Sequence, residues 1–263
     1  MELTVKGKKA YAYTGGKTFD AKLPTVVFCH GAQCDHSVWI LQSRYLAHHG
    51  YGVLALDLPG HGRSEGPALA RIEDLADWVV AVLDAAGVGQ ASVVGHSMGS
   101  LIALDCAACH PARVAKIALL ATAYPMKVSA ELLDATKNDE PLAQDMVNIW
   151  SHLAYAQYPN NPGPGFWVIG ENLRLMQRQQ PGVMHVDFAA CNAYAGGAQA
   201  AAKVRCPALF LLARRDAMTP MRTAQGFAKS IEDAQVVVID GSGHNMMGEK
   251  PDEVLDTLVA FLK

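Results

Sequence analysis

The sequence predicts an α/β protein with a mostly parallel central sheet and helices on both of its faces. Short, continuous apolar runs alternate with segments of helical apolar spacing, and this alternation is typical of strand–helix–strand units. The apolar runs carry no regular polar positions, so both faces of each strand are expected to be buried. The alternation stops near residue 124 and resumes after residue 205, which indicates a helical insertion.

The strands and helices of the first half follow one another closely. Residues 2–6 and 9–14 are expected to form a β-hairpin that turns at Gly7. Residues 71–86 place apolar side chains on one face of a helix, and Gly87 ends it. The other segments expected before the insertion are strands at 25–29, 52–56, 92–95 and 116–121, a helix at 37–49, and a helix from residue 98 toward Pro111.

The second half begins with the insertion. Helical patterns dominate residues 125–205, and a stretch rich in proline and glycine interrupts them at residues 158–165. Strands are expected again at 207–213 and 235–239, with helices near 220–230 and at 251–262. We therefore predict one core domain, formed by residues 1–124 and 206–263, into which residues 125–205 are inserted as a helical cap or lid.

Composition and charge restrict the classes of function. The 263 residues are 51% hydrophobic and 18% charged, as is typical of a soluble globular protein. A net charge of −3 gives no basis for nucleic acid or an acidic membrane as a partner. The charged N-terminus does not resemble a signal peptide, and no apolar run approaches the ~20 residues of a membrane span. We expect a cytoplasmic protein that acts on a small molecule, and leave its oligomeric state open.

The six cysteines do not indicate a metal site. Cys106 and Cys109 have CxxC spacing, but no second pair follows at the spacing of zinc ligands. Both lie in an alanine-rich segment of helical character, where buried reduced thiols are the simpler interpretation. We predict neither a metal nor a disulfide.

The motif with the clearest chemistry is Gly95-His96-Ser97-Met98-Gly99. An apolar strand precedes this Gly-x-Ser-x-Gly sequence and a helix-forming run follows it, as in a nucleophile elbow, where a sharp turn exposes the serine. Glycines two positions before and after Ser97 relieve the crowding in such a turn. The alternative is an ordinary strand-to-helix turn without catalytic function.

Several motifs together carry a family resemblance. They are His30-Gly31, the turn Asp57-x-Pro-Gly-His-Gly-Arg-Ser64, the elbow, Arg215-Asp216 and Gly243-His244. In this combination and order the chain resembles the α/β-hydrolase superfamily, and within it small bacterial serine esterases that carry a cap. Lactonases and carbon–carbon bond hydrolases are relatives of these esterases. The resemblance implies the α/β-hydrolase fold for the core and says little about the insertion.

The chain order Ser97, Asp216, His244 is the order in which this fold carries its catalytic triad. In that interpretation His244 takes the proton of the Ser97 hydroxyl, and Asp216 holds and stabilises the imidazole ring. His244 could instead be a solvated loop residue. Asp216 could cap the helix that starts near Pro220, or pair with a neighbouring arginine. Asp57 and His61 are interpreted as parts of a structural turn.

Two backbone amides are expected to form an oxyanion hole. One belongs to Met98, which follows the nucleophile, and the resemblance implies Ala32 as the other. Asp35 is expected to cap a helix rather than to form a polar pair with His36. Trp39 would either wall the acyl pocket or pack in the core. The candidates to line a lid over Ser97 are Trp150, Tyr155, Tyr158, Phe166, Trp167, Met176 and Met184.

The function predicted from these residues is serine esterase activity on small to medium apolar substrates, through an acyl-enzyme and without a cofactor. Alternatives on the same fold are a lactonase or carbon–carbon bond hydrolase of aromatic catabolism, or a cofactor-free haloperoxidase. Asn172, Arg174 and Arg178 are candidates to bind the dienolate that carbon–carbon cleavage would require. A ligand receptor without catalytic activity is an alternative of another class.

Overall fold

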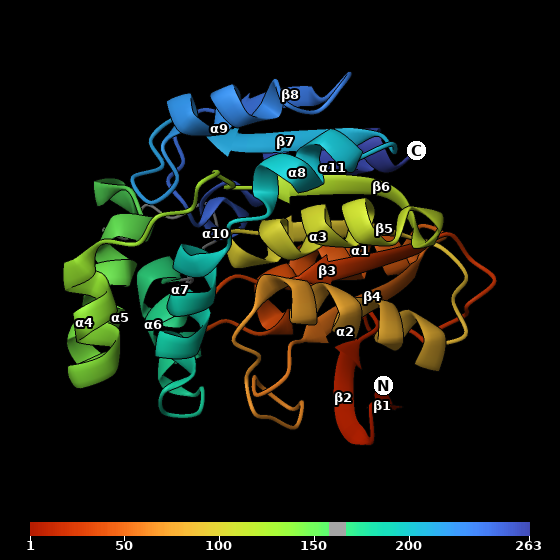
Figure 1. Ribbon diagram of the computed structural model, residues 1–263, viewed down its shortest axis with the longest axis horizontal. Coiled ribbons are helices and arrows are strands. Elements are labelled where there is room, and N and C mark those ends of the chain that lie inside the picture. Colours follow the sequence, from red (N-terminus) through yellow and green to blue (C-terminus); the bar gives the residue numbers. More distant parts are fainter. Residues whose placement is uncertain (158–166) are drawn as a thin grey trace.

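The computed structural model describes residues 1–157 and 167–263, and its centre is a mostly parallel sheet (Figure 1). Within the described chain the sheet has eight strands in the order β1-β2-β4-β3-β5-β6-β7-β8. Only the pairings of β2 with β1 and with β4 are antiparallel. The strands are β1 (Glu2–Val5), β2 (Lys8–Tyr13), β3 (Thr25–Cys29), β4 (Gly52–Asp57), β5 (Ala91–His96), β6 (Val114–Leu120), β7 (Ala208–Ala213) and β8 (Gln235–Ile239). The predicted hairpin and parallel sheet are confirmed.

Helices cover both faces of the sheet, as the apolar runs predicted. Along β3, Val27 and Cys29 face one hydrophobic cluster, while Val26 and Phe28 face another on the opposite side. The first cluster is covered by α2 (Ile72–Ala85), α3 (Met98–Cys109), α8 (Gly197–Lys203) and α9 (Met221–Ala228), and the second by α1 (Ile40–His48) and α11 (Pro251–Leu262). None of the helices in the described chain is long and apolar enough to cross a membrane.

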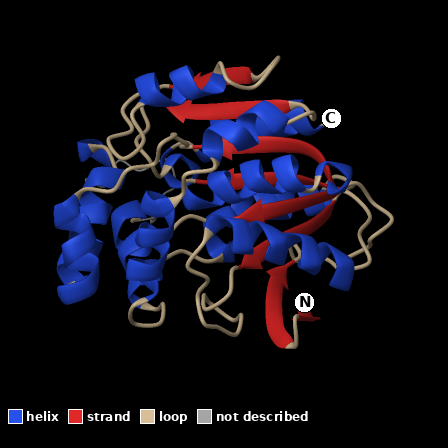
Figure 2. Ribbon diagram, viewed as in Figure 1, coloured by secondary structure: helices blue, strands red, loops and turns tan. Residues whose placement is uncertain are grey.

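Helices are the only regular secondary structure among the described residues between β6 and β7. Four of them, here called the cap helices, lie beyond the carboxyl ends of the parallel strands (Figure 2). They are α4 (Ala130–Asn138), α5 (Glu140–Ser151), α6 (Val168–Gln177) and α7 (Val183–Ala193), and the short 3₁₀ helix η3 (Ala154–Gln157) follows α5. The cap helices share a small apolar core that includes Leu132, Ala143 and Met184. The next helix, α8, packs against α3 instead.

All six cysteines are free thiols. Burial raises the pKa of Cys29 to about 12, and burial raises the pKa of Cys106 well above its ordinary value. Because the thiolate is the reactive form of cysteine, these two side chains act as small apolar core residues at neutral pH.

Candidate active site

The turn at Ser97 has the geometry expected of a nucleophile elbow. Ser97 has φ 51° and ψ −117°, a conformation that non-glycine residues rarely adopt, between the end of β5 and the start of α3. A Cβ atom on Gly95 would overlap the carbonyl group of Gly99, and one on Gly99 would overlap the carbonyls of Cys29 and His30. Both glycines are therefore required where the strand turns into the helix.

Asp216 and His244 meet beside this turn. Asp216 follows β7 and His244 follows β8, and His244 Nδ1 lies 2.8 Å from Asp216 Oδ2. Both residues are buried. Burial alone would raise the pKa of Asp216, but the His244 ring and the hydrogen bonds from Thr219 outweigh it and hold this pKa below its usual value. An ionised Asp216 accepts a hydrogen bond from Nδ1–H of His244, so the unprotonated Nε2 on the other side of the ring is left to act as a base.

Asp216 also contacts the turn that precedes α9. Its Oδ1 atom accepts hydrogen bonds from the amides of Met218 and Thr219, at 2.9 and 2.8 Å. Asp216 therefore does stabilise the turn before α9, in addition to holding His244. Within the described chain Asp216 forms its ion pair with His244 and with neither neighbouring arginine, and Arg214 pairs with Asp240.

Ser97 and His244 line the same small cavity, of about 40 Å³. The core contributes Gly31, Ala32 and His96 to its walls. The cap helices contribute Val147 and Ser151 from α5, Asn172 and Met176 from α6, and Phe188 from α7. The predicted serine and histidine are thus brought together, in a pocket between the cap helices and the sheet.

The loop after β3 passes over Ser97. A Cβ atom on Gly31 would lie 3.3 Å from Ser97 Cβ, and Ala32 lines the cavity. His30 accepts a hydrogen bond from the Leu58 amide through Nε2, so its Nδ1 carries the proton and donates to the Gly31 carbonyl at 2.8 Å. In a trans peptide the N–H points opposite to the preceding carbonyl, so this bond also fixes the direction of the Ala32 amide.

The second predicted oxyanion donor lies at the start of α3. Met98 is the first residue of that helix, where backbone amides have no partner within the helix.

The histidine rings that neighbour the pocket, His30 and His96, are neutral. Burial lowers the pKa of His30 to about 4 and that of His96 to about 3. Neither can serve as a cation in the pocket at neutral pH.

The backbone around His244 is held from three directions. His96 Nε2 donates to the His244 carbonyl at 2.9 Å. The amide of Gly243 donates to the buried carboxylate of Glu249 at 2.6 Å, and the amide of Asn245 donates to the Ser151 carbonyl of the cap at 3.0 Å. Glu249 was not predicted as a site residue, because in the sequence it is one of several charged residues near the start of a helix.

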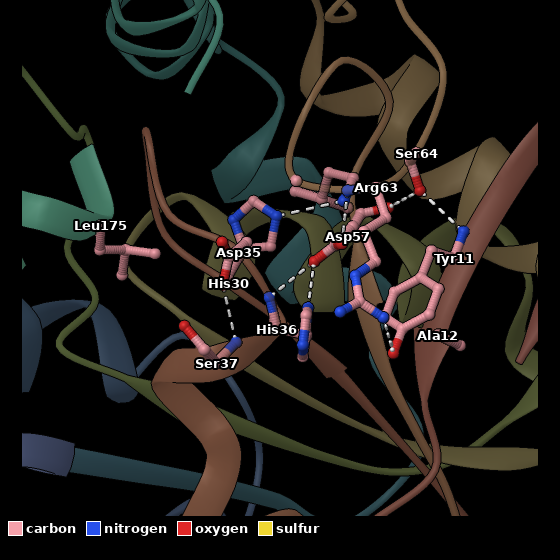
Figure 3. A network of polar contacts seen from close by, with 12 residues as sticks. Tyr11, Ala12, His30, Asp35, His36, Ser37, Asp57, Arg63, Ser64 and Leu175 are labelled. Atoms are coloured by element: carbon pink, nitrogen blue, oxygen red, sulfur yellow. Dashed lines mark hydrogen bonds and ion pairs between the residues drawn. The ribbon is translucent and has the colours of Figure 1, made fainter. Parts of the chain in front are cut away.

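Asp57 organises the turn after β4 rather than the cavity (Figure 3). Its Oδ1 atom accepts from both the amide and Nδ1 of His36, and its Oδ2 atom accepts from the Arg63 amide. Ser64 Oγ donates to the Asp57 carbonyl at 2.6 Å and accepts from the Tyr11 amide, which joins the turn to β2. These contacts fit the structural role expected for Asp57.

One cluster near this turn has the composition of a metal site. Asp35, His36 and Asp57 offer ligand atoms within 4.8 Å of one another. Arg178 already occupies the Asp35 carboxylate, with Nη2 at 2.6 Å and Nε at 2.9 Å from Oδ2. The other oxygen of Asp35 accepts from the Ser37 amide, as predicted for a helix cap. We assign no metal to this cluster, because arginine and backbone donors already satisfy its carboxylates.

The tryptophans differ from the expectation. Trp39 is fully buried and packs on Phe28 with ring centroids 5.0 Å apart, so it is a core residue, and its neighbour Val38 lines the cavity instead. Trp150 is 37% exposed and Trp167 is 62% exposed, and neither is among the described residues that line the cavity. Trp39 therefore takes the second of its two expected roles, and the pocket role expected for Trp150 and Trp167 was wrong.

The other lid candidates divide into groups. Met176 lines the cavity, while Met184 packs in the apolar core of the cap helices. Tyr158, Phe166 and the side chain of Tyr155 lie outside the described part of the chain. Val147, Phe188 and Met218 line the cavity but were not predicted. Helical spacing indicates which face of a helix is buried, and not whether that face meets a cavity or another side chain.

A larger groove of about 720 Å³ adjoins the cavity. It runs between the start of α1 and α6, and the residues that it shares with the cavity are Val38, Asn172, Asn245 and Met247. Leu41 and Leu175 give it an apolar lining, and Arg174 and Arg178 also border it. Of the three residues considered for a dienolate, Asn172 lines the cavity, Arg174 lines only the groove, and Arg178 is paired with Asp35.

Comparisons with known proteins show the family and the fold of the chain. A family model described as alpha/beta hydrolase fold matches residues 24–251. An (E)-2-((N-methylformamido)methylene)succinate hydrolase from Acinetobacter baylyi is 25% identical over 90% of each chain. A pimeloyl-[acyl-carrier protein] methyl ester esterase from Chromobacterium violaceum is 31% identical over 84% of this chain and 87% of its own. The crystal structure of an enol-lactonase from Burkholderia xenovorans LB400 superimposes with a TM-score of 0.88, at 23% identity over 100% of this chain and 99% of that one.

Proposed function

Because the chain belongs to the α/β-hydrolase family, we propose that it is a serine hydrolase that cleaves carboxylic esters through an acyl-enzyme. One observation carries the proposal. The 2.8 Å contact between His244 Nδ1 and Asp216 Oδ2 leaves Nε2 as the proton acceptor beside the cavity where the strained Ser97 lies. This arrangement supports the roles of nucleophile for Ser97, base for His244 and orienting acid for Asp216.

The reaction follows from these positions. Ser97 Oγ attacks the ester carbonyl while His244 Nε2 takes its proton. The carbonyl oxygen becomes negatively charged, and the amides of Ala32 and Met98 stabilise it. His244 returns the proton to the alcohol, which leaves, and an acyl-enzyme remains. Water then attacks the carbonyl of the acyl-enzyme while His244 takes its proton. His244 returns that proton to Ser97 Oγ, and the acid is released.

The two connected spaces suggest a substrate class. The cavity of about 40 Å³ holds little more than the reacting group, so the rest of the substrate extends into the apolar groove of about 720 Å³. Small to medium apolar esters suit this arrangement. The similarity to a methyl ester esterase supports ester cleavage. Lactones remain the second candidate, because a lactone is an internal ester and the same steps open it.

The test is a substrate panel combined with an active-site label. A fluorophosphonate should label Ser97 and no other serine, and p-nitrophenyl esters of graded chain length should be hydrolysed. A lactone, a ring-fission product and a monochlorodimedone assay with acetate and peroxide would be run on the same preparation. Labelling of Ser97 without turnover of any ester would contradict the esterase proposal, and turnover of another substrate would identify the alternative.

A further inference from the structure

We propose that Asp187, on cap helix α7, is a positioning residue for the oxyanion hole. This inference rests on the function proposed above. The Asp187 carboxylate is buried, and its Oδ2 atom accepts a hydrogen bond from the backbone amide of Gln33 at 2.8 Å. Gln33 directly follows Ala32, the residue whose amide would stabilise the oxyanion. A carboxylate of the cap therefore holds the loop that supplies one of the two donors.

The Gln33 backbone depends on such contacts. Its φ of 52° lies in the left-handed region, which a residue other than glycine adopts only at a cost in free energy. A second cap carboxylate holds the side chain of the same residue, because Gln33 Nε2 donates to Glu140 Oε1 at 2.7 Å. His30 fixes the preceding peptide from the core side through the Gly31 carbonyl. The Ala32 amide is thus held between a contact from the core and contacts from the cap.

The carboxylate of Asp187 also fastens α7 to the core. His61 Nε2 lies 2.8 Å from the same Oδ2 atom, and His61 Nδ1 lies 3.0 Å from the Pro59 carbonyl. Both ring nitrogens face acceptors, so His61 donates from both and is an imidazolium opposite the Asp187 carboxylate. The other ionisable groups near the His61 ring are His30, at 4.8 Å between ring centroids, and Asp57. This buried ion pair keeps the Asp187 carboxylate in place for Gln33.

The proposal predicts different results for two substitutions. Asp187→Ala leaves the Gln33 amide without its acceptor, and we expect kcat for p-nitrophenyl acetate to fall about 10-fold to 100-fold with little change in KM. This is less than the roughly 10²–10³-fold cost of removing an oxyanion donor outright, because the Ala32 amide is displaced and not lost. Asp187→Asn can keep an oxygen at the position of Oδ2, where it still accepts from the Gln33 amide and from Nε2 of His61, so it should retain most of the activity. Tyr194→Phe is the matched control, because it removes the 2.8 Å contact of Tyr194 with Asp105 next to the same helix, away from the loop.

A trifluoromethyl ketone separates positioning from general stability. Ser97 Oγ adds to its carbonyl carbon, the carbonyl electrons form an oxyanion, and the serine proton moves to His244. We expect Asp187→Ala to weaken this inhibitor by the same factor as kcat/KM, while the Kd of the corresponding methylene analogue, which forms no oxyanion, stays unchanged. Equal weakening of both inhibitors, or the same loss in Tyr194→Phe, would overturn the proposal.

Two further measurements keep the test decisive. If Asp187→Ala does not fold, the double variant with His61→Leu and Asp187→Leu removes both buried charges and still deprives Gln33 of its acceptor, so the same loss of kcat is expected. Wild-type activity in Asp187→Ala or in the double variant would refute the positioning role. Absence of fluorophosphonate labelling at Ser97 in the unaltered protein would instead refute the proposed function.

Discussion

Glu249 holds the peptide next to His244, with its Oε2 atom 2.6 Å from the amide of Gly243. Its other oxygen accepts from the amide of Leu153, which follows cap helix α5, at 2.8 Å. Within the described chain the hydrogen-bond partners of Glu249 are all donors, namely the amides of Gly243 and Leu153 and the hydroxyl of Ser242. Burial raises the pKa of Glu249, and these donors act against that rise. One carboxylate therefore ties the cap to the loop that carries the proposed base.

Glu249→Gln should reduce both activity and stability. The amide would place a donor opposite one of two backbone donors, at a cost of about 1–3 kcal/mol in the free energy of unfolding. We expect kcat to fall as well, because the His244 loop would shift. Ser242→Ala, which removes a longer 3.4 Å contact to the same carboxylate, serves as the control and should change less. Urea unfolding and ester kinetics on both variants measure the difference, and an unaltered Glu249→Gln enzyme would contradict this role.

Ser97→Ala should abolish ester hydrolysis and leave the fold intact. The hydroxyl would bond covalently to the acyl group, so its removal should lower turnover about 10⁴-fold or more. Steady-state kinetics and circular dichroism check the two parts of this expectation. Hydrolysis near the wild-type rate would end the serine mechanism.

Asp216→Asn should cost about 10³-fold or more in kcat, because the amide would favour the wrong tautomer of His244. Asp57→Asn tests the assignment, since Asp57 is equally buried but binds His36 and backbone amides of its own turn. It should lower the melting temperature more than the rate constant of the folded enzyme. Asp134→Asn, on cap helix α4, should change neither. A larger loss of kcat in Asp57→Asn would identify the wrong acid.

The sequence predicted those parts of the site that depend on local patterns. Buried strands, the elbow at Ser97 and the loops that carry Asp216 and His244 follow from apolar runs and turn residues close to each other in the chain. The contacts between cap and core did not follow, because Asp187 and Gln33 are 154 positions apart and an acidic residue on a helix usually faces solvent. Trp150 and Trp167 were misjudged, and Trp39 was left between two roles, for a related reason: size and apolarity do not distinguish a pocket wall from the core or from an exposed cap surface.

The His61–Asp187 pair should make stability depend on pH. Burial alone would lower the pKa of His61, but the Asp187 carboxylate outweighs it, so the folded-state pKa lies above the unfolded value of about 6.5. Its contribution to the free energy of unfolding is therefore full below about pH 6.5 and is lost as the pH rises through the folded-state pKa. We expect His61→Gln to be more destabilising at pH 6 than at pH 9. Urea unfolding of both proteins measures this, and an equal difference at the two pH values would exclude a charged His61.

The apolar lining of the groove should determine which ester chain lengths the protein prefers. Leu41 and Leu175 line the groove, whereas Trp150 does not. Leu41→Trp and Leu175→Trp should narrow it and shift preference from medium-chain toward short-chain p-nitrophenyl esters. One apolar contact is worth ~1–3 kcal/mol, so a shift of roughly 10-fold to 200-fold in the ratio of kcat/KM values is the limit for each contact. The acetate ester should be hydrolysed at nearly the original rate.

Trp150→Ala is the matched control for the groove variants. The side chain is 37% exposed on α5, so its loss should leave the ratio between short and medium esters unchanged. The melting temperature of each variant distinguishes lost stability from altered selectivity. If Trp150→Ala changed the ratio and the leucine variants did not, the substrate chain would bind along the outer side of the cap and not between α1 and α6.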